Sequence, residues 1–317
     1  MLRIKLLLLS SLFSVITFAQ WQPVGEKIKT RWSSQIDVNN VLPEYPRPLM
    51  ERSEWMILNG LWNYAILPVG KPAPSAFDGK ILVPFAVESS LSGVQKNVGK
   101  ANELWYEREF TIPSKWKNNR VLLHFGAVDW KTDVWVNDVK VGRHTGGYTP
   151  FSFEITTALK NGSNKLIVKV WDPTNDGYQP RGKQVNKPEG IWYTPVTGIW
   201  QTVWLEPVPD KFITQVKTTP NIDINILNIE VETNNFSASD RIEVKVMDGS
   251  RVVATAQSIN HLPVEIVMPD QVKLWSPDSP FLYDLEISLW SGTKQIDKVK
   301  SYAAMRKYSI KRDENGI

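Results

Sequence analysis

Apolar and polar residues alternate along two segments in the second half of the chain. Between residues 241 and 247, Ile242, Val244 and Val246 share one face, and charged residues stand between them. The segment 283–289 repeats this pattern with aromatic and aliphatic residues on one face. A period of two is typical of a strand with one face on a core and the other in solvent. Both segments therefore predict strands of an antiparallel sandwich.

Four strand-like segments lie in the chain up to residue 205. They are residues 120–125, 133–137, 165–171 and 199–205. The last two have the β-branched and aromatic content of half-buried strands, and 199–205 has apolar residues on both faces, so we expect both of its faces to be covered. Asn137 and Asp138 stand where a two-residue hairpin turn would lead into the next strand. No stretch of convincing length shows the 3.6-residue period of a helix.

These patterns predict an all-β protein made of two antiparallel β-sandwiches. The larger spans residues 20–207 and the smaller residues 210–305, with the proline-containing segment 207–210 as a linker. Twelve of the 14 tryptophans lie at or before Trp204, which predicts a more aromatic core for the larger sandwich. Flat indole rings also pack well on sugar rings, and the sequence leaves open which tryptophans are exposed to do so.

The first 19 residues have the three-part pattern of a secretory signal peptide. Arg3 and Lys5 precede an apolar run over residues 6–16, and Ala19 closes a small-residue cleavage site. The run is too short to span a bilayer. We therefore expect residues 1–19 to be removed and the mature protein to be secreted or periplasmic, with no membrane attachment.

Composition and charge exclude several classes of function. The sequence has no cysteine, which excludes disulfides, thiolate metal sites and cysteine nucleophiles. The formal net charge of +4 falls to +2 when the two basic residues of the signal peptide are removed. The remaining basic residues are scattered, so we expect no nucleic-acid partner. Three histidines without metal-ligand or Ser/His/Asp spacing predict neither a metal nor a cofactor.

Six segments carry motifs that follow one another along nearly all of the chain after residue 19. They are residues 47–62, 83–93, 104–110, 134–151, 197–200 and 274–283. In this order they resemble the N-terminal part of glycoside hydrolase family 2, the group of β-galactosidases, β-glucuronidases and β-mannosidases. The resemblance implies a jelly-roll sugar-binding domain over 20–207, then an immunoglobulin-like sandwich over 210–305, then a catalytic barrel.

The resemblance also implies that the catalytic residues lie outside this sequence. A barrel takes about 250 residues, and residues 306–317 resemble only the strand and turn that lead into it. Family members hydrolyse β-glycosides with retention through two glutamates on the barrel. Glu103 follows an asparagine, as the family's acid/base glutamate does, but it stands in a strand-like segment of the sugar-binding domain. We therefore expect no catalytic residue in this chain.

Asp172 is the main candidate for contact with a sugar. Residues 170–172 resemble the strand end at which β-galactosidases of the family present an aspartate to the barrel's pocket, and a carboxylate suits sugar hydroxyls because it accepts hydrogen bonds. The polar loop that follows carries Arg181, Lys183 and Gln184, which could donate to a substrate or to the barrel rim. The alternative is a turn-capping aspartate at the start of a solvated loop.

Three hypotheses follow for the function. In the first, the chain is the N-terminal part of a secreted retaining β-glycosidase, forms one wall of its sugar pocket, and is inactive without a barrel expected C-terminal of Ile317. In the second, it is an autonomous, non-catalytic carbohydrate-binding module. In the third, it is a structural or adhesive sandwich protein without affinity for sugars.

Overall fold

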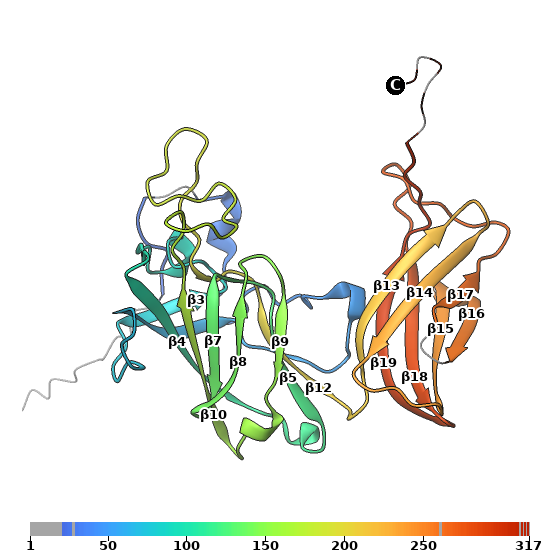
Figure 1. Cartoon of the computed structure of the whole chain (residues 1–317), viewed down its shortest axis with the longest axis horizontal. Coiled ribbons are helices and arrows are strands. Elements are labelled where there is room, and N and C mark those ends of the chain that lie inside the picture. The colour runs from blue at the N-terminus through green and yellow to red at the C-terminus, as the bar shows by residue number, and fades with distance from the viewer. Residues whose placement is uncertain are drawn as a thin grey trace, which may run out of the picture.

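The computed structural model describes residues 21–26, 29–259, 262–310, 312, 314 and 316. The regular elements of these residues are β-strands and short 3₁₀ turns, which confirms the prediction of an all-β protein. Figure 1 shows two β-sandwiches side by side, the first in blue to yellow-green and the second in orange to red. Within the described ranges, no helix has the length and apolar character needed to cross a membrane. The predicted signal peptide lies outside the described residues.

The first sandwich consists of two antiparallel sheets and one additional strand pair. The six-stranded sheet has the order β3 (Gly79–Val83), β2 (Gly60–Pro68), β4 (Asn102–Thr111), β10 (Ser163–Trp171), β7 (Lys131–Val136), β8 (Val139–Thr145). The facing four-stranded sheet has the order β1 (Met56–Ile57), β12 (Val203–Val208), β5 (Arg120–Phe125), β9 (Phe151–Glu154). The additional pair joins β11 (Gly198–Ile199) to β6 (Val128–Asp129). The 3₁₀ turns are η1 (Arg31–Gln35), η2 (Pro48–Met50), η3 (Ser90–Ser92), η4 (Ser114–Trp116) and η5 (Thr156–Ala158).

Alternation along β4 shows how this sandwich is filled. Leu104 and Tyr106 point into the core between the sheets, where Tyr106 meets the fully buried Trp62 edge to face at 6.2 Å. The intervening Trp105 points to the outer face of the six-stranded sheet and stacks on Trp135 at 5.9 Å. Both faces of β4 are therefore covered by large side chains.

The predicted hairpin at Asn137 and Asp138 is confirmed, because both residues have positive φ (48° and 68°) between β7 and β8. The single strand predicted over residues 199–205 is wrong. It is two strands, β11 and β12, separated by residues 200–202. Trp200 leaves the strand register because its indole donates a hydrogen bond to the carbonyl of Gly147 at 2.8 Å. Tertiary contact thus overrides a strand-like local sequence.

The second sandwich follows the predicted alternation closely. One antiparallel sheet has the order β13 (Ile213–Asn221), β14 (Ile226–Thr233), β17 (Val264–Val267). The other has the order β16 (Arg251–Ile259), β15 (Asp240–Asp248), β18 (Tyr283–Ser291), β19 (Lys294–Ala303). Ile242, Val244 and Val246 of β15 are buried at 3% exposure or less, whereas Glu243 and Lys245 are more exposed. The core therefore lies on the face of β15 that the sequence indicated.

A buried ion pair joins the two sandwiches. Arg52 lies in the segment between η2 and β1, and its guanidinium donates to both carboxylate oxygens of Asp297 on β19 at 2.5 and 2.9 Å. The same side chain donates to the carbonyl of Ile213 at the start of β13 at 2.8 Å. Glu51 and Lys300 add a backbone bridge beside it. The N-terminal segment thus ties the second sandwich to the first.

Glu206 on β12 is the centre of a second buried polar cluster. Its carboxylate, which is fully buried, accepts hydrogen bonds from Tyr45 (2.6 Å), Arg47 (2.7 Å) and Trp204 (2.7 Å). Burial opposes ionisation of Glu206, but the His124 ring and the Arg47 guanidinium lower its pKa to about 2. The ionised carboxylate therefore anchors the N-terminal segment to the four-stranded sheet at neutral pH.

Candidate functional site

Three buried carboxyl groups converge at one end of the first sandwich. Asp172 directly follows β10, Asp129 ends β6, and Glu88 lies between β3 and η3. Their exposed fractions are 3% for Asp172, 3% for Glu88 and 8% for Asp129. We call this set the carboxyl cluster. It combines one residue that the sequence pointed to with two that it did not.

Thr197 connects two members of the carboxyl cluster. Its hydroxyl donates to Oδ2 of Asp172 at 3.0 Å, and its backbone N–H donates to Oε2 of Glu88 at 2.9 Å. Asp172 also accepts from the backbone N–H of Thr174 at 2.7 Å and from the hydroxyl of that residue at 3.3 Å. The bond from residue 174 back to the carboxylate is an Asx turn. Asp172 therefore does cap a turn, and the cap is buried.

The carboxyl cluster concentrates like charges where water is scarce. Burial, with the charges of Asp172 and Glu88, raises the pKa of Asp129 to about 8. Burial also raises the pKa of Glu88 to about 7 and shifts that of Asp172 upward. Within the part of the chain that the structure describes, the Asp129 carboxyl makes no hydrogen bond and no ion pair. A buried carboxyl without a partner is costly, and here a hydrogen-bond donor would be stabilising.

Glycine is required beside Asp129. A Cβ on Gly147 would lie 2.5 Å from Oδ1 of Asp129, so only glycine allows the backbone to approach the carboxyl this closely. The neighbouring Gly146 has a φ of +137°, a backbone conformation that favours glycine. Tyr148, which is 47% exposed, continues this segment outward and meets the Trp200 ring at 6.2 Å. An aromatic pair therefore borders the carboxyl cluster on the solvent side.

The predicted loop residues lie apart from Asp172. The Lys183 ammonium stands 5.9 Å from the centre of the Tyr193 ring, and Gln184 forms a backbone bridge with Tyr193. Arg181 is half-buried, and its Nε has no hydrogen-bond partner within the described ranges. Among the described contacts, none joins Arg181, Lys183 or Gln184 to Asp172. Their contact with substrate stays a prediction.

The same loop presents aromatic side chains to solvent. Tyr178 is fully exposed, Trp192 is 43% exposed and Tyr193 is 61% exposed. Figure 1 shows the loop projecting beyond the strands at the top of the first sandwich. Gln179 ties its base to the Asx turn through a 2.6 Å hydrogen bond to the carbonyl of Thr174. The base of the loop is thus held next to the carboxyl cluster, and the aromatic side chains farther along the loop are exposed to solvent.

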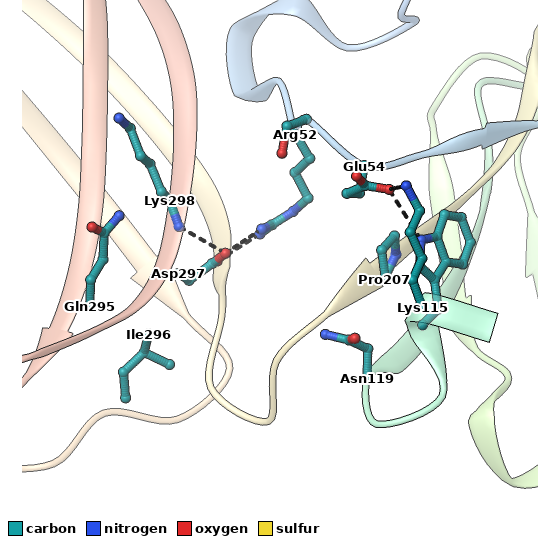
Figure 2. Close-up of a pocket in the computed structure, with 11 residues that line it drawn as sticks. Arg52, Glu54, Lys115, Asn119, Pro207, Gln295, Ile296, Asp297 and Lys298 are labelled. Atoms are coloured by element: carbon teal, nitrogen blue, oxygen red, sulfur yellow. Dashed lines mark hydrogen bonds and ion pairs between the residues drawn. The ribbon is translucent and has the colours of Figure 1, made fainter. Parts of the chain in front are cut away.

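Two other features have charged groups that already pair with one another, so they fit a ligand site less well. A cavity of 540 Å³ lies between the sandwiches (Figure 2), but its charged groups pair with one another, as in Arg52 with Asp297 and Lys115 with Glu54. Glu103 lies within β4 and pairs with Lys169 at 2.9 Å. In the ranges that the structure covers, no three His, Cys, Asp or Glu side chains are grouped so as to hold a metal ion.

Sequence reasoning missed Glu88 and Asp129. Glu88 falls inside the motif at residues 83–93, but nothing in its local pattern marks it as buried. Asp129 ends a two-residue strand too short to give a periodic signal. The carboxyl cluster forms where three segments distant in sequence come together. Of its three members, the resemblance to the family pointed to Asp172 alone.

Comparison with known proteins agrees with the two-sandwich fold. Residues 83–209 match the family model described as "Glycosyl hydrolases family 2, sugar binding domain". Residues 211–306 match the model described as "Glycosyl hydrolases family 2". The crystal structure of Ruminococcus gnavus β-glucuronidase superposes with a TM-score of 0.66 at 21% identity, over 85% of this chain and 47% of that one. This likeness shows the fold.

Curated relatives are considerably longer than this chain. A β-galactosidase of Thermoanaerobacter pseudethanolicus is 28% identical over 222 residues, which cover 66% of this chain and 29% of that protein. A β-glucuronidase of Bacteroides fragilis is 27% identical over 225 residues, which cover 66% of this chain and 32% of that protein. The chain thus spans about a third or less of these relatives. Since the two matched regions cover most of the sequence, the chain belongs to glycosyl hydrolase family 2, of which it carries the sugar-binding domain and the immunoglobulin-like domain.

Proposed function

We propose that this chain is the N-terminal, non-catalytic part of a secreted retaining β-glycosidase. The end of the first sandwich that holds the carboxyl cluster supplies one wall of the sugar pocket. The substrate class is a β-glycoside, such as the galactosides and glucuronides for which the relatives are named. Hydrolysis would be carried out by a barrel C-terminal of Ile317. No cofactor is part of the proposal.

The observation that carries the proposal is the unpaired carboxyl of Asp129 in the carboxyl cluster. Sugar hydroxyls are hydrogen-bond donors, and each can satisfy a buried carboxylate oxygen. Asp172 and Glu88 already share Thr197, so Asp129 is the member that most needs a donor from outside the domain. A pocket completed by a neighbouring domain and filled by a sugar would supply one.

The direction of the chain supports the placement of the barrel. Residues 304–310 leave the second sandwich at the top of Figure 1, the end at which the aromatic loop of the first sandwich also projects. Tyr308 is 77% exposed and Ile310 fully exposed on this segment. A domain that follows residue 310 would therefore start at the end of the molecule toward which the aromatic loop projects. Arg181, Lys183 and Gln184 would then lie at its rim, where they could donate to substrate.

Hydrolysis assays on the purified chain test the proposal. We expect no turnover of aryl β-galactosides or β-glucuronides above the buffer control, because the retaining mechanism needs two carboxyl groups about 5–5.5 Å apart across the scissile bond. Turnover at ordinary enzyme rates, about 1–10³ s⁻¹, would overturn it. A chain that hydrolyses nothing but binds neutral β-glycosides tightly by itself would favour the autonomous binding module instead.

Secretion has its own test. Expression in a bacterial host followed by cell fractionation should place the protein outside the cytoplasm, with Gln20 as its first residue by N-terminal sequencing. Replacement of Leu7 and Leu8 by arginine should retain it in the cytoplasm with residues 1–19 attached. An unprocessed protein in the cytoplasm with the natural sequence would contradict export.

A further inference from the structure

The outer face of the six-stranded sheet carries a hollow that the proposed function does not use. Its volume is 240 Å³, and its lining includes Glu103, Lys131, Asp133, Lys169 and Trp171. We call it the outer-face hollow. It is smaller than the sites of about 300–1,000 Å³ that hold drug-sized ligands, and its size suits one sugar ring.

The floor of the outer-face hollow is a fixed row of alternating charges from neighbouring strands. The Lys169 ammonium lies 2.9 Å from Glu103 and 3.7 Å from Asp133. Arg143 donates to both oxygens of Asp133 at 2.8 and 3.0 Å. Although burial opposes it, hydrogen bonds from Arg143 and Lys140 lower the pKa of Asp133 to about 2. Asp133 is therefore ionised and held in place before any ligand arrives.

Trp171 forms an aromatic wall of the hollow. Its indole N–H donates to the carbonyl of Lys100 at 2.9 Å, which fixes the ring. The ring is half-buried, and Trp130 supports it edge to face at 6.4 Å. An indole held in this way offers a flat apolar surface of the kind on which the C–H face of a pyranose packs. Because the ring is already held in place, its side chain loses little conformational entropy when a ligand binds.

Lys131 gives the hollow its charge preference. It is paired with Trp171 in the antiparallel register of β7 and β10, so the two side chains are neighbours on one face. Within the described part of the chain, its ammonium makes no ion pair or hydrogen bond, unlike those of Lys140 and Lys169. The lining cations Lys131, Arg143 and Lys169 outnumber the carboxylates Glu103 and Asp133. The hollow therefore favours an anionic ligand.

We infer that the outer-face hollow is a second carbohydrate site, which binds one pyranose unit that carries a carboxylate or a sulfate. The Trp171 ring packs on the apolar face of the sugar, and the Lys131 ammonium pairs with its anionic group. Glu103 accepts hydrogen bonds from its hydroxyls, because Lys169 and the backbone N–H of Gly70 use only part of the capacity of that carboxylate. A uronic acid and a sulfated sugar share this chemistry, and the experiment below separates them.

The second site is separate from the carboxyl cluster. Trp171 and Asp172 are consecutive, so their side chains leave the strand on opposite sides. Asp172 turns inward to Thr197, whereas Trp171 lies on the outer face. The chain can bind at the outer-face hollow whether or not the carboxyl cluster belongs to a glycosidase pocket. The two proposals can therefore fail independently.

Calorimetric titration of the purified chain tests the second site. The probes are the methyl glycoside of galacturonic acid as its sodium salt, glucose 6-sulfate and neutral methyl β-glucoside. We expect at least one anionic probe to bind about tenfold or more tightly than the neutral one, as a charge-assisted hydrogen bond allows, and added salt to weaken it. The anionic probe that binds more tightly identifies the natural ligand as a uronic acid or a sulfated sugar. Equal or absent binding of all three probes overturns the inference.

Matched variants assign any binding to the hollow. Lys131→Met should weaken the anionic probe about tenfold, and Trp171→Ala should abolish binding. Lys165→Met, on the same strand as Trp171 but with its ammonium 3.6 Å from Asp138, is the control and should bind as the natural sequence does. Asp172→Asn should also leave this affinity unchanged. Affinity unaffected by Lys131→Met, or lost with Asp172→Asn in a folded protein, would contradict the assignment.

Discussion

Replacement of Asp129 by asparagine should change how the stability of the first sandwich depends on pH. Asparagine has nearly the same shape, so it fits beside Gly147, but it cannot ionise. In the natural protein the pKa of Asp129 is raised from 3.8 to about 8, so the folded state holds a proton that the unfolded state releases near pH 4. The contribution of Asp129 to stability is therefore fully present below that pH and is lost as the pH rises toward 8.

The size of the effect follows from this proton difference. Between pH 5 and 7 the folded state holds about one more proton at Asp129 than the unfolded state, so the free energy of unfolding falls by about 1.4 kcal/mol per pH unit. This site alone accounts for about 3 kcal/mol over the interval. Glu88, whose pKa is raised to about 7, adds to the slope in the same direction. The Asp129→Asn variant should lose the first contribution and retain the second.

Urea unfolding followed by tryptophan fluorescence at pH 5, 6 and 7 measures these slopes. Twelve of the 14 tryptophans lie at or before Trp204, so the signal reports mainly on the first sandwich. Asp138→Asn, whose side chain is 87% exposed in the β7–β8 turn, is the control and should keep the natural slope. Equal slopes for Asp129→Asn and the natural sequence would refute the reasoning that the Asp129 carboxyl is buried with a raised pKa.

Three further predictions concern the ties that hold the fold. Arg52→Met leaves Asp297 buried without its partner and should lower the free energy of unfolding by about 3–5 kcal/mol; denaturant unfolding measures it, with the exposed Arg251→Met as control. The pKa of Glu206 is lowered from 4.5 to about 2, so stability should fall by about 3 kcal/mol as the pH drops between these values, and Glu206→Gln should flatten that acid limb. Gly147→Ala should cost about 1–3 kcal/mol through overlap with Asp129, and an unchanged melting temperature would contradict the close approach.

The second sandwich was more predictable from the sequence than the first. Strand β15 alternates between buried aliphatic and more exposed charged residues, so a period of two identifies both the strand and its inner face. In the first sandwich both sheet faces are covered, so the alternation is weak. The residues around Trp200 look like a strand, but contacts distant in sequence take them out of it. The Trp200 indole donates to the carbonyl of Gly147, 53 positions away, and the backbone N–H groups of Trp200 and Gln201 both donate to the carbonyl of Ala127.

The candidate site shows the same limit. The resemblance pointed to Asp172, and the position of that residue after β10 follows from the strand pattern. The convergence of Glu88 and Asp129 on it depends on how three distant segments pack, which no local pattern encodes. The sequence predicts that Lys183 and Gln184 are polar residues of a loop. Their contact with Tyr193 depends on how that loop folds, which the sequence pattern does not indicate.

The central claim is that Asp172 and its neighbours form a wall of a glycosidase pocket completed by a C-terminal barrel. The most direct test is steady-state kinetics on the protein extended through the reading frame that follows the codon for Ile317. An open frame of about 250 codons and hydrolysis of an aryl β-glycoside are predicted, with kcat/KM reduced about tenfold or more by Asp172→Asn through a lost charge-assisted hydrogen bond. A stop codon at that point, or unchanged kcat/KM in the folded variant, would contradict the account.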